Sequence, residues 1–103
     1  MSKKNIIDEF TNILAVALRH KIGSIVNPNA LYAERYAKDS EIFFKQAEKI
    51  NRGNWNSRDK LEIKQELIIK LKKELEKKDF LPDEKYVYMD DEINKSLTSL
   101  GII

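Results

Sequence analysis

His20 is the only histidine in this sequence, and its ordinary pKa near neutrality makes it the first candidate for proton or phosphoryl chemistry. It stands between Arg19 and Lys21, and no carboxylate lies three or four residues away to share a metal ion with it. Three adjacent cations are typical of the last turn of a helix, where positive charge meets the negative end of the helix dipole. The sequence has no cysteine, which excludes disulfides, thiolate metal sites and a cysteine nucleophile.

The segment around this histidine, residues 18–27 (LRHKIGSIVN), resembles the histidine box of sensor kinases and histidine phosphotransferases. The resemblance implies a solvent-facing His20 that accepts a phosphoryl group on a helical hairpin. Those families usually place an acidic residue directly after the histidine as a base, whereas this chain has Lys21. The Asn27-Pro28 pair, which is expected to end the helix, also follows His20 sooner than it would in a long hairpin helix. Histidine phosphotransfer through His20 is therefore an alternative function.

A second candidate is the segment around Trp55, the only tryptophan. Residues 45–60 contain five basic and two acidic side chains. The basic ones are Lys45, Lys49, Arg52, Arg58 and Lys60. An aromatic ring among guanidinium and amide groups can stack on a nucleic-acid base. Tryptophan and arginine also dominate the hot spots of protein interfaces. The same ring could instead close one end of the core, so three interpretations stay open for Trp55: core, protein contact and nucleic-acid contact.

A third group is acidic and comprises Asp83, Glu84, Asp90, Asp91 and Glu92. Carboxylates suit divalent cations, but the spacing lacks the pattern of a calcium-binding loop. Residues 90–92 stand where the first turn of a helix favours negative charge. We therefore expect helix capping here, or contact with a basic partner surface, and neither a metal nor another cofactor.

Apolar residues recur with helical spacing through most of the chain. This spacing predicts helices over about 5–22, 28–50 and 58–78, and a short last helix that Asp90 or Asp91 caps and that ends near Leu100. We expect Gly23 to terminate the first helix, and Asn27 to cap the second with Pro28 in its first turn. Asn56 or Ser57 should cap the third helix. Residues 85–89 have a β-type composition and should form an extended connector that packs Tyr86, Val87 and Tyr88 over the bundle.

The predicted inward faces contain most of the large side chains. For 28–50 they include Leu31, Tyr32, Tyr36, Phe43, Ala47 and Ile50, and for 58–78 they are Leu61, Ile63, Leu67, Ile68, Leu71 and Leu75. These two helices have similar lengths and should pair with each other in antiparallel orientation. The predicted second helix carries an aromatic row, namely Tyr32, Tyr36, Phe43 and Phe44. If the bundle leaves this row uncovered, it becomes the interface of a homodimer.

The composition indicates one domain over residues 1–103. The chain is 42% hydrophobic and 35% charged, with only three glycines and two prolines, which favours long regular elements. We predict an all-α fold, a small antiparallel bundle of three long helices and a short C-terminal helix. The longest apolar run near the N-terminus, residues 13–18, is too short to span a bilayer. We therefore expect a cytoplasmic protein that does not bind membranes.

The function expected from these residues is binding. A formal net charge of +2 is too small to indicate nucleic-acid binding by itself. The chain also lacks a glycine-rich phosphate loop and the usual groups of catalysis, so we do not expect an enzyme. The leading hypothesis is an accessory protein that makes protein or nucleoprotein contacts through the basic Trp55 segment. The alternatives are histidine phosphotransfer through His20 and a nucleic-acid-binding accessory subunit.

Overall fold

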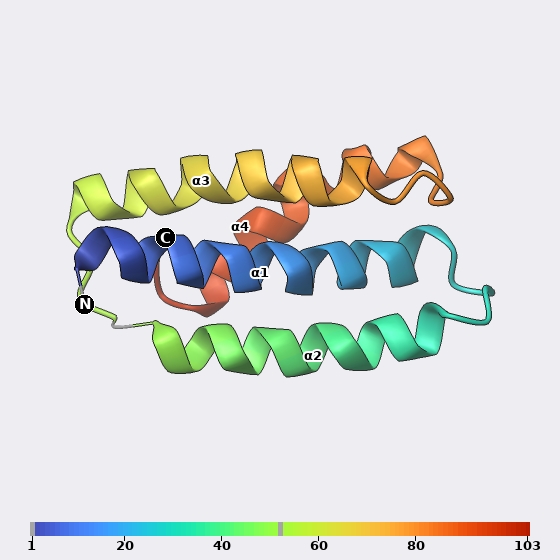
Figure 1. Ribbon diagram of the computed structural model, residues 1–103, viewed down its shortest axis with the longest axis horizontal. Helices are drawn as coiled ribbons and strands as arrows, with labels where there is room; N and C mark the ends of the chain where they lie inside the picture. The colour runs from blue at the N-terminus through green and yellow to red at the C-terminus, as the bar shows by residue number, and fades with distance from the viewer. Residues whose placement is uncertain (1, 52) are drawn as a thin grey trace.

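The computed structural model describes residues 2–51 and 53–103 and consists of helices joined by short turns (Figure 1). The elements in chain order are α1 (Lys3–Val26), α2 (Ala33–Ile50), α3 (Ser57–Glu76), the 3₁₀ helix η1 (Asp83–Tyr88) and α4 (Met89–Ser99). The predicted all-α bundle of three long helices and one short C-terminal helix is confirmed. No helix within the described residues is long and apolar enough to cross a bilayer.

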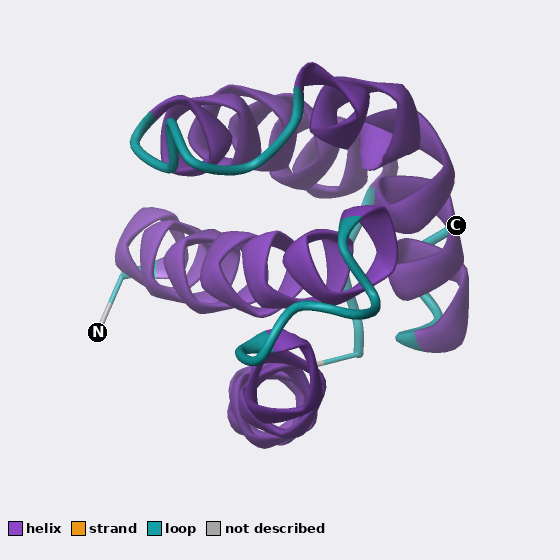
Figure 2. Cartoon of the chain, turned by 90° about the vertical axis from the view of Figure 1, so that its right-hand side faces the viewer, coloured by secondary structure: helices purple, strands orange, loops and turns teal. Residues whose placement is uncertain are grey.

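The first helix, α1, is the central element. It lies between α2 and α3, and α4 covers a further side of it (Figures 1 and 2). Its buried residues therefore occupy more than one face, and they include the adjacent pairs Ile6–Ile7, Leu14–Ala15 and Ala17–Leu18. The helix begins after Ser2, whose hydroxyl oxygen accepts a hydrogen bond from the backbone N–H of Asn5 at 3.2 Å.

The predicted end of α1 at residue 22 is wrong, because the helix continues through Gly23 to Val26. Gly23 lies within the helix, and the ring of Tyr36 packs against it. A Cβ atom at position 23 would lie 2.7 Å from Cδ2 of Tyr36. Glycine is therefore required here for the close approach of α2, and Arg19, His20 and Lys21 do not lie in the last helical turn.

The predicted start of α2 at Asn27-Pro28 is also wrong. Residues 27–32 form successive turns, in which the N–H of Ala30 bonds to the carbonyl of Asn27 at 3.1 Å. The Asn27 side chain donates to the hydroxyl of Tyr32 at 3.0 Å and does not cap the helix. Leu31, which was expected to face inward, is fully exposed in this connection.

A repeat of seven residues organises the contact of α2 with α1. The buried residues of α2 are the small side chains Ala33, Ser40 and Ala47, which let the two helices approach closely. The Ser40 hydroxyl donates to the backbone carbonyl of Ala17 at 2.8 Å. Among the described helices α2 contacts only α1, so the expected pairing of the second and third helices is wrong. The flanks of α2 away from α1 are left without a neighbouring helix (Figure 2).

The third helix, α3, begins in a reciprocal capping box between Asn56 and Asp59, so Asn56, one of the two residues predicted for this role, is the cap. Its buried stripe is Ile63, Leu67, Leu71 and Leu75. Two residues expected on this stripe, Leu61 and Ile68, lie on the exposed side of the helix. The helix runs parallel to α1 in the bundle (Figure 1).

The end of the chain closes the core. Residues 83–88 form η1 and not the predicted extended connector, and Tyr86 and Val87 are exposed while Tyr88 is half-buried. Asp90 and Asp91 lie in the first turn of α4 without forming a side-chain cap. Gly101 ends α4 in the left-handed region with φ +75°, and the N–H of Ile102 bonds to the carbonyl of Leu97 at 2.8 Å. This turn buries Ile102 in the core.

Candidate protein-binding groove

Trp55 lies in the core, with only 7% of its surface exposed. Its indole Nε1–H donates to Oδ1 of Asn51 at 2.8 Å, and the amide nitrogen of Asn51 in turn donates to the carbonyl of Leu100 at 3.0 Å. These bonds tie the connection after α2 to the end of α4. The ring therefore closes one end of the bundle and is not available to stack on a base or to enter a partner's pocket.

The basic residues that accompany Trp55 in the sequence do not form one patch. Lys45 and Lys49 are exposed on α2, whereas Arg58 is exposed and Lys60 half-buried on α3. These two helices lie on opposite sides of α1 (Figure 1). The fifth residue, Arg52, lies outside the described part of the chain. The structure thus divides the predicted basic site between two separate surfaces.

His20 is buried in the contact between α1 and α2. Its Nδ1 lies 2.8 Å from the carbonyl oxygen of Val16, to which it donates, and its ring lies against Tyr36 and Phe43 with centroid distances of 5.1 and 5.4 Å. Burial lowers its pKa below the ordinary 6.5, and the neighbouring Arg19 guanidinium lowers it further. This environment holds the imidazole neutral and encloses it among aromatic rings, unlike an exposed phosphoacceptor.

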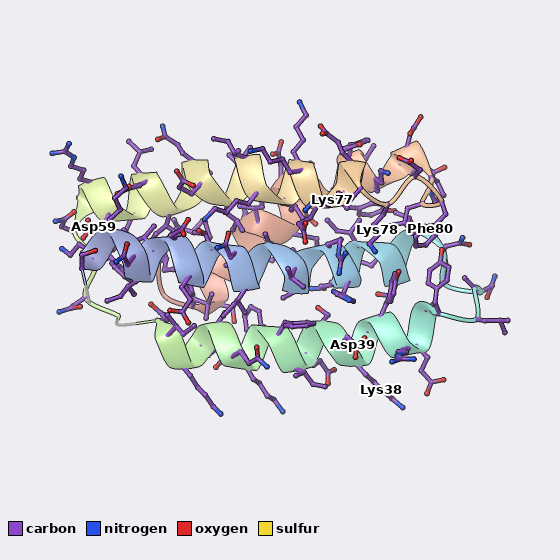
Figure 3. The ribbon with its side chains drawn as sticks, in the orientation of Figure 1. Lys38, Asp39, Asp59, Lys77, Lys78 and Phe80 are labelled. Carbon is purple, nitrogen blue, oxygen red and sulfur yellow. The ribbon has the colours of Figure 1, made fainter. Side chains whose placement is uncertain are left out.

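Two further charged groups act on this histidine, one from α2 and one from the connection after α3. The carboxylate of Asp39 in α2 raises the pKa of His20, while the ammonium group of Lys78 lowers it. Figure 3 shows the two residues on opposite sides of α1, with Lys77 and Phe80 beside Lys78. Phe80 packs edge-on against Tyr32 at 5.4 Å. Tyr32, Tyr36 and Phe43 of the predicted dimer seam therefore pack within the chain, and only Phe44 of that row borders a cavity.

A groove lies between α2 and α4, with α1 as its floor. Its volume is about 600 Å³, and it is open to solvent along one side. Its apolar lining consists of Leu18, Ile25, Ala37 and Phe44. Its charged lining consists of Lys21, Glu41, Lys45, Glu48, Glu92 and Lys95. We call this hollow the α2/α4 groove.

An ion pair across the groove joins its floor to one of its walls. Oε1 of Glu92 on α4 lies 2.7 Å from the ammonium group of Lys21 on α1, and Oε2 lies 3.5 Å from that of Lys95. The Glu92 side chain is only 3% exposed, whereas the two lysine side chains are about half exposed. Oε1 accepts no well-aligned hydrogen bond within the described residues, although the Lys21 ammonium group lies at ion-pair distance. Glu92 is thus a buried carboxylate in the groove wall whose ion-pair partners are two half-exposed lysines.

Sequence reasoning did not single out Glu92 for this role. In the sequence it adjoins Asp90 and Asp91 and resembles part of a helix-capping cluster, but those two side chains are exposed whereas Glu92 is buried. One signal was present in the sequence: Glu92 precedes Ile93 and lies four residues before Ser96, which places a carboxylate on the buried stripe of α4. Lys21 is 71 positions away, so no local pattern reveals the pair. Within residues 2–51 and 53–103, no cluster of acidic or histidine side chains forms a metal site.

We compared the chain with known protein families, proteins and structures. No protein-family model, no curated protein and no solved structure matches the chain.

Proposed function

We propose that this chain is a small helical binding protein that docks a helical segment of a protein partner in the α2/α4 groove. The observation that supports the proposal most strongly is the buried Glu92 carboxylate in the wall of an open groove. Burying a carboxylate costs free energy even when it is paired, and an apolar side chain there would often be at least as stable. A role in recognising a partner would explain why position 92 carries a charge. A position that only packs in the core would not need one.

The shape of the groove favours a helix over a small molecule. Two helices form its walls and a third forms its floor, so the space resembles the position of an absent helix of the bundle. A small ligand would instead require a pocket that encloses most of its surface. The groove is open along one side, and its apolar floor is narrow. An amphipathic helix with an apolar stripe and polar flanks matches these properties.

The proposed function is still protein binding, as expected from the sequence, but the proposed binding surface is the α2/α4 groove and not the Trp55 segment. The Trp55 ring is buried and its basic neighbours are divided, so contact through the α2/α4 groove has better support than contact through the Trp55 segment. Nucleic-acid binding and phosphotransfer through His20 receive no support from the geometry, because the stacking ring and the imidazole are both enclosed.

Site-specific photocrosslinking in cells tests the proposal. A benzophenone side chain replaces Ser99, which lines the groove from α4, and in a matched control it replaces the exposed Gln65 on α3. We expect a discrete adduct from position 99 only, and its crosslinked peptide should belong to an amphipathic helix. The adduct should disappear when Ile25→Arg places a charge on the groove floor. Equal adducts from both positions, or no adduct from position 99, would contradict the proposal.

A further inference from the structure

The exposed side of α2 carries a charge repeat with a period of seven residues. Glutamates occupy positions 34, 41 and 48, and lysines occupy positions 38 and 45, each set spaced by seven. The small buried residues Ala33, Ser40 and Ala47 share the same period, so both charged rows keep a constant orientation relative to α1. The rows continue along the part of α2 that borders the groove, where Glu41, Lys45 and Glu48 form its rim.

This charge pattern is complementary to itself in one orientation only. A two-fold axis perpendicular to α2 at Phe43 would place Glu41 opposite Lys45 of a second copy, and Lys38 opposite Glu48. Each pair would occur twice because the interface is symmetric. A parallel arrangement would place every residue opposite its own copy, so that like charges would meet. The pattern therefore selects the antiparallel arrangement.

The centre of this arrangement is apolar. Phe44 of α2 is half-buried and lines the wall of the α2/α4 groove. It lies one residue from the axis at Phe43, so the Phe44 rings of the two copies would lie near each other at the axis. Aromatic pairs contribute beyond the area that they bury. A central aromatic contact surrounded by charge pairs is the usual arrangement of a small specific interface.

The ordinary explanation of these charges is pairing within one helix, and the structure shows it for only part of the repeat. Lys38 and Glu34 lie 3.4 Å apart at i, i+4 spacing. Glu41 and Lys45 have the same spacing, but neither has an ion-pair partner within 4 Å among the described residues. The charges of the two residues nearest to the axis therefore remain available to a second copy.

We propose that the occupant of the α2/α4 groove is α2 of a second copy of this chain, packed antiparallel about Phe43. This inference rests on the proposed function and identifies its partner. The helix is about 27 Å long, so the interface is small and the dimer is weak, with a Kd of roughly micromolar to hundreds of micromolar. Its stability should decrease as salt concentration rises, because exposed charges contribute to it.

Sedimentation equilibrium of charge-reversed variants tests this inference. Lys45→Glu and Glu41→Lys each place like charges opposite one another, so each variant alone should dimerise at least about tenfold more weakly than the wild type. An equimolar mixture of the two variants should form a heterodimer, because every opposing pair at these positions is again of opposite sign. Lys72→Glu on the exposed side of α3 is the matched control and should leave the dimer unchanged. Circular dichroism of each variant checks that the helices are retained.

The equimolar mixture distinguishes a loss of docking from a loss of folding. A misfolded variant would not form a heterodimer when it is mixed with the other variant. A wild-type chain that stays monomeric at millimolar concentration and low salt would overturn the inference. So would a dimer that the two reversals leave unchanged, or a mixture that dimerises no better than its components. If one of these results accompanies an adduct between position 99 and a different protein, the groove binds a partner but not a second copy. If position 99 also gives no adduct, the proposed function fails as well.

Discussion

The Lys21 ammonium group lies 2.7 Å from Oε1 of Glu92 and joins the central helix α1 to α4 across the floor of the α2/α4 groove. The carboxylate is buried, whereas the lysine side chain is about half exposed. The pair is therefore asymmetric, because loss of the lysine leaves a buried charge and loss of the glutamate charge leaves a solvated one. This asymmetry gives the first prediction.

Lys21→Met should destabilise the fold by about 1–3 kcal/mol, because Oε1 of the buried Glu92 loses its ion-pair partner and only Lys95 remains, 3.5 Å from the other oxygen. Glu92→Gln should cost less, and the double variant should be more stable than the sum of the single effects predicts. Urea denaturation of the four proteins measures this coupling. Lys38→Met, which removes an exposed ion pair of α2, serves as the control and should change stability by less than about 1 kcal/mol. Additive effects of Lys21→Met and Glu92→Gln would show that the pair does not stabilise the groove.

Gly23→Ala should not produce the gain of about 0.5–1 kcal/mol that replacing a glycine within a helix usually brings. The new Cβ would lie 2.7 Å from the Tyr36 ring and would push α2 away from α1. In a Tyr36→Ala background the clash is absent, so the same substitution should become stabilising. Thermal unfolding of the proteins with Gly23 and with Gly23→Ala, in the wild-type and in the Tyr36→Ala background, measures the two effects. A stabilising Gly23→Ala in the wild-type background would contradict the packing of Tyr36 on Gly23.

The stability of the protein should fall between about pH 7.5 and about pH 5.5, because His20 has a lowered pKa in the folded state. The sign follows from proton binding. In the unfolded chain the imidazole binds a proton as the pH falls through 6.5, while the folded state resists protonation until the pH is lower. His20→Phe keeps an aromatic ring between Tyr36 and Phe43 and should remove this part of the pH dependence.

Urea unfolding at several pH values measures that effect. Asp8 and Asp59 also have lowered pKa values, through ion pairs with Lys70 and Lys3, but their contributions are lost only from about pH 5 downward, as the unfolded carboxyls bind protons. The two pH windows are therefore separate. An unchanged slope between neutral and mildly acidic pH in His20→Phe would show that His20 titrates as an ordinary exposed histidine.

The fluorescence of Trp55 should report a buried indole. We expect a blue-shifted emission maximum, weak quenching by iodide and no change on addition of a single-stranded oligonucleotide, because the ring is in the core. Trp55→Phe should lose the hydrogen bond to Asn51 and destabilise the fold by roughly 1 kcal/mol or more. Strong quenching by an oligonucleotide at low salt would instead support the nucleic-acid interpretation of this segment.

The elements that depend on local chemistry were predictable from the sequence. The Asn56 cap and the glycine termination after Leu100 each follow from a few adjacent residues, and both are present. The end of α1 was not predictable in this way, because Gly23 normally terminates a helix. Inside α1 it packs against Tyr36, which belongs to another helix.

The arrangement of the helices was the second point that local patterns did not reveal. Similar lengths suggested that the second and third helices pair, but α1 has apolar residues on more faces and takes the central position. Leu61 and Ile68 appear on an apolar stripe of α3 in the sequence, yet α3 has only one side covered by the bundle. The α2/α4 groove depends on this arrangement, as does the pair between Lys21 and Glu92.

The central claim is that the α2/α4 groove binds a helix, and chemical-shift mapping by NMR tests it most directly. The ¹⁵N-labelled protein is titrated with the segment that crosslinks to position 99, or is diluted in steps if that segment is α2 of a second copy. We predict that the largest amide shifts occur at groove residues, among them Leu18, Ile25, Phe44 and Ser96. Shifts that concentrate on the exposed face of α3, around Leu61 and Ile68, would contradict the account.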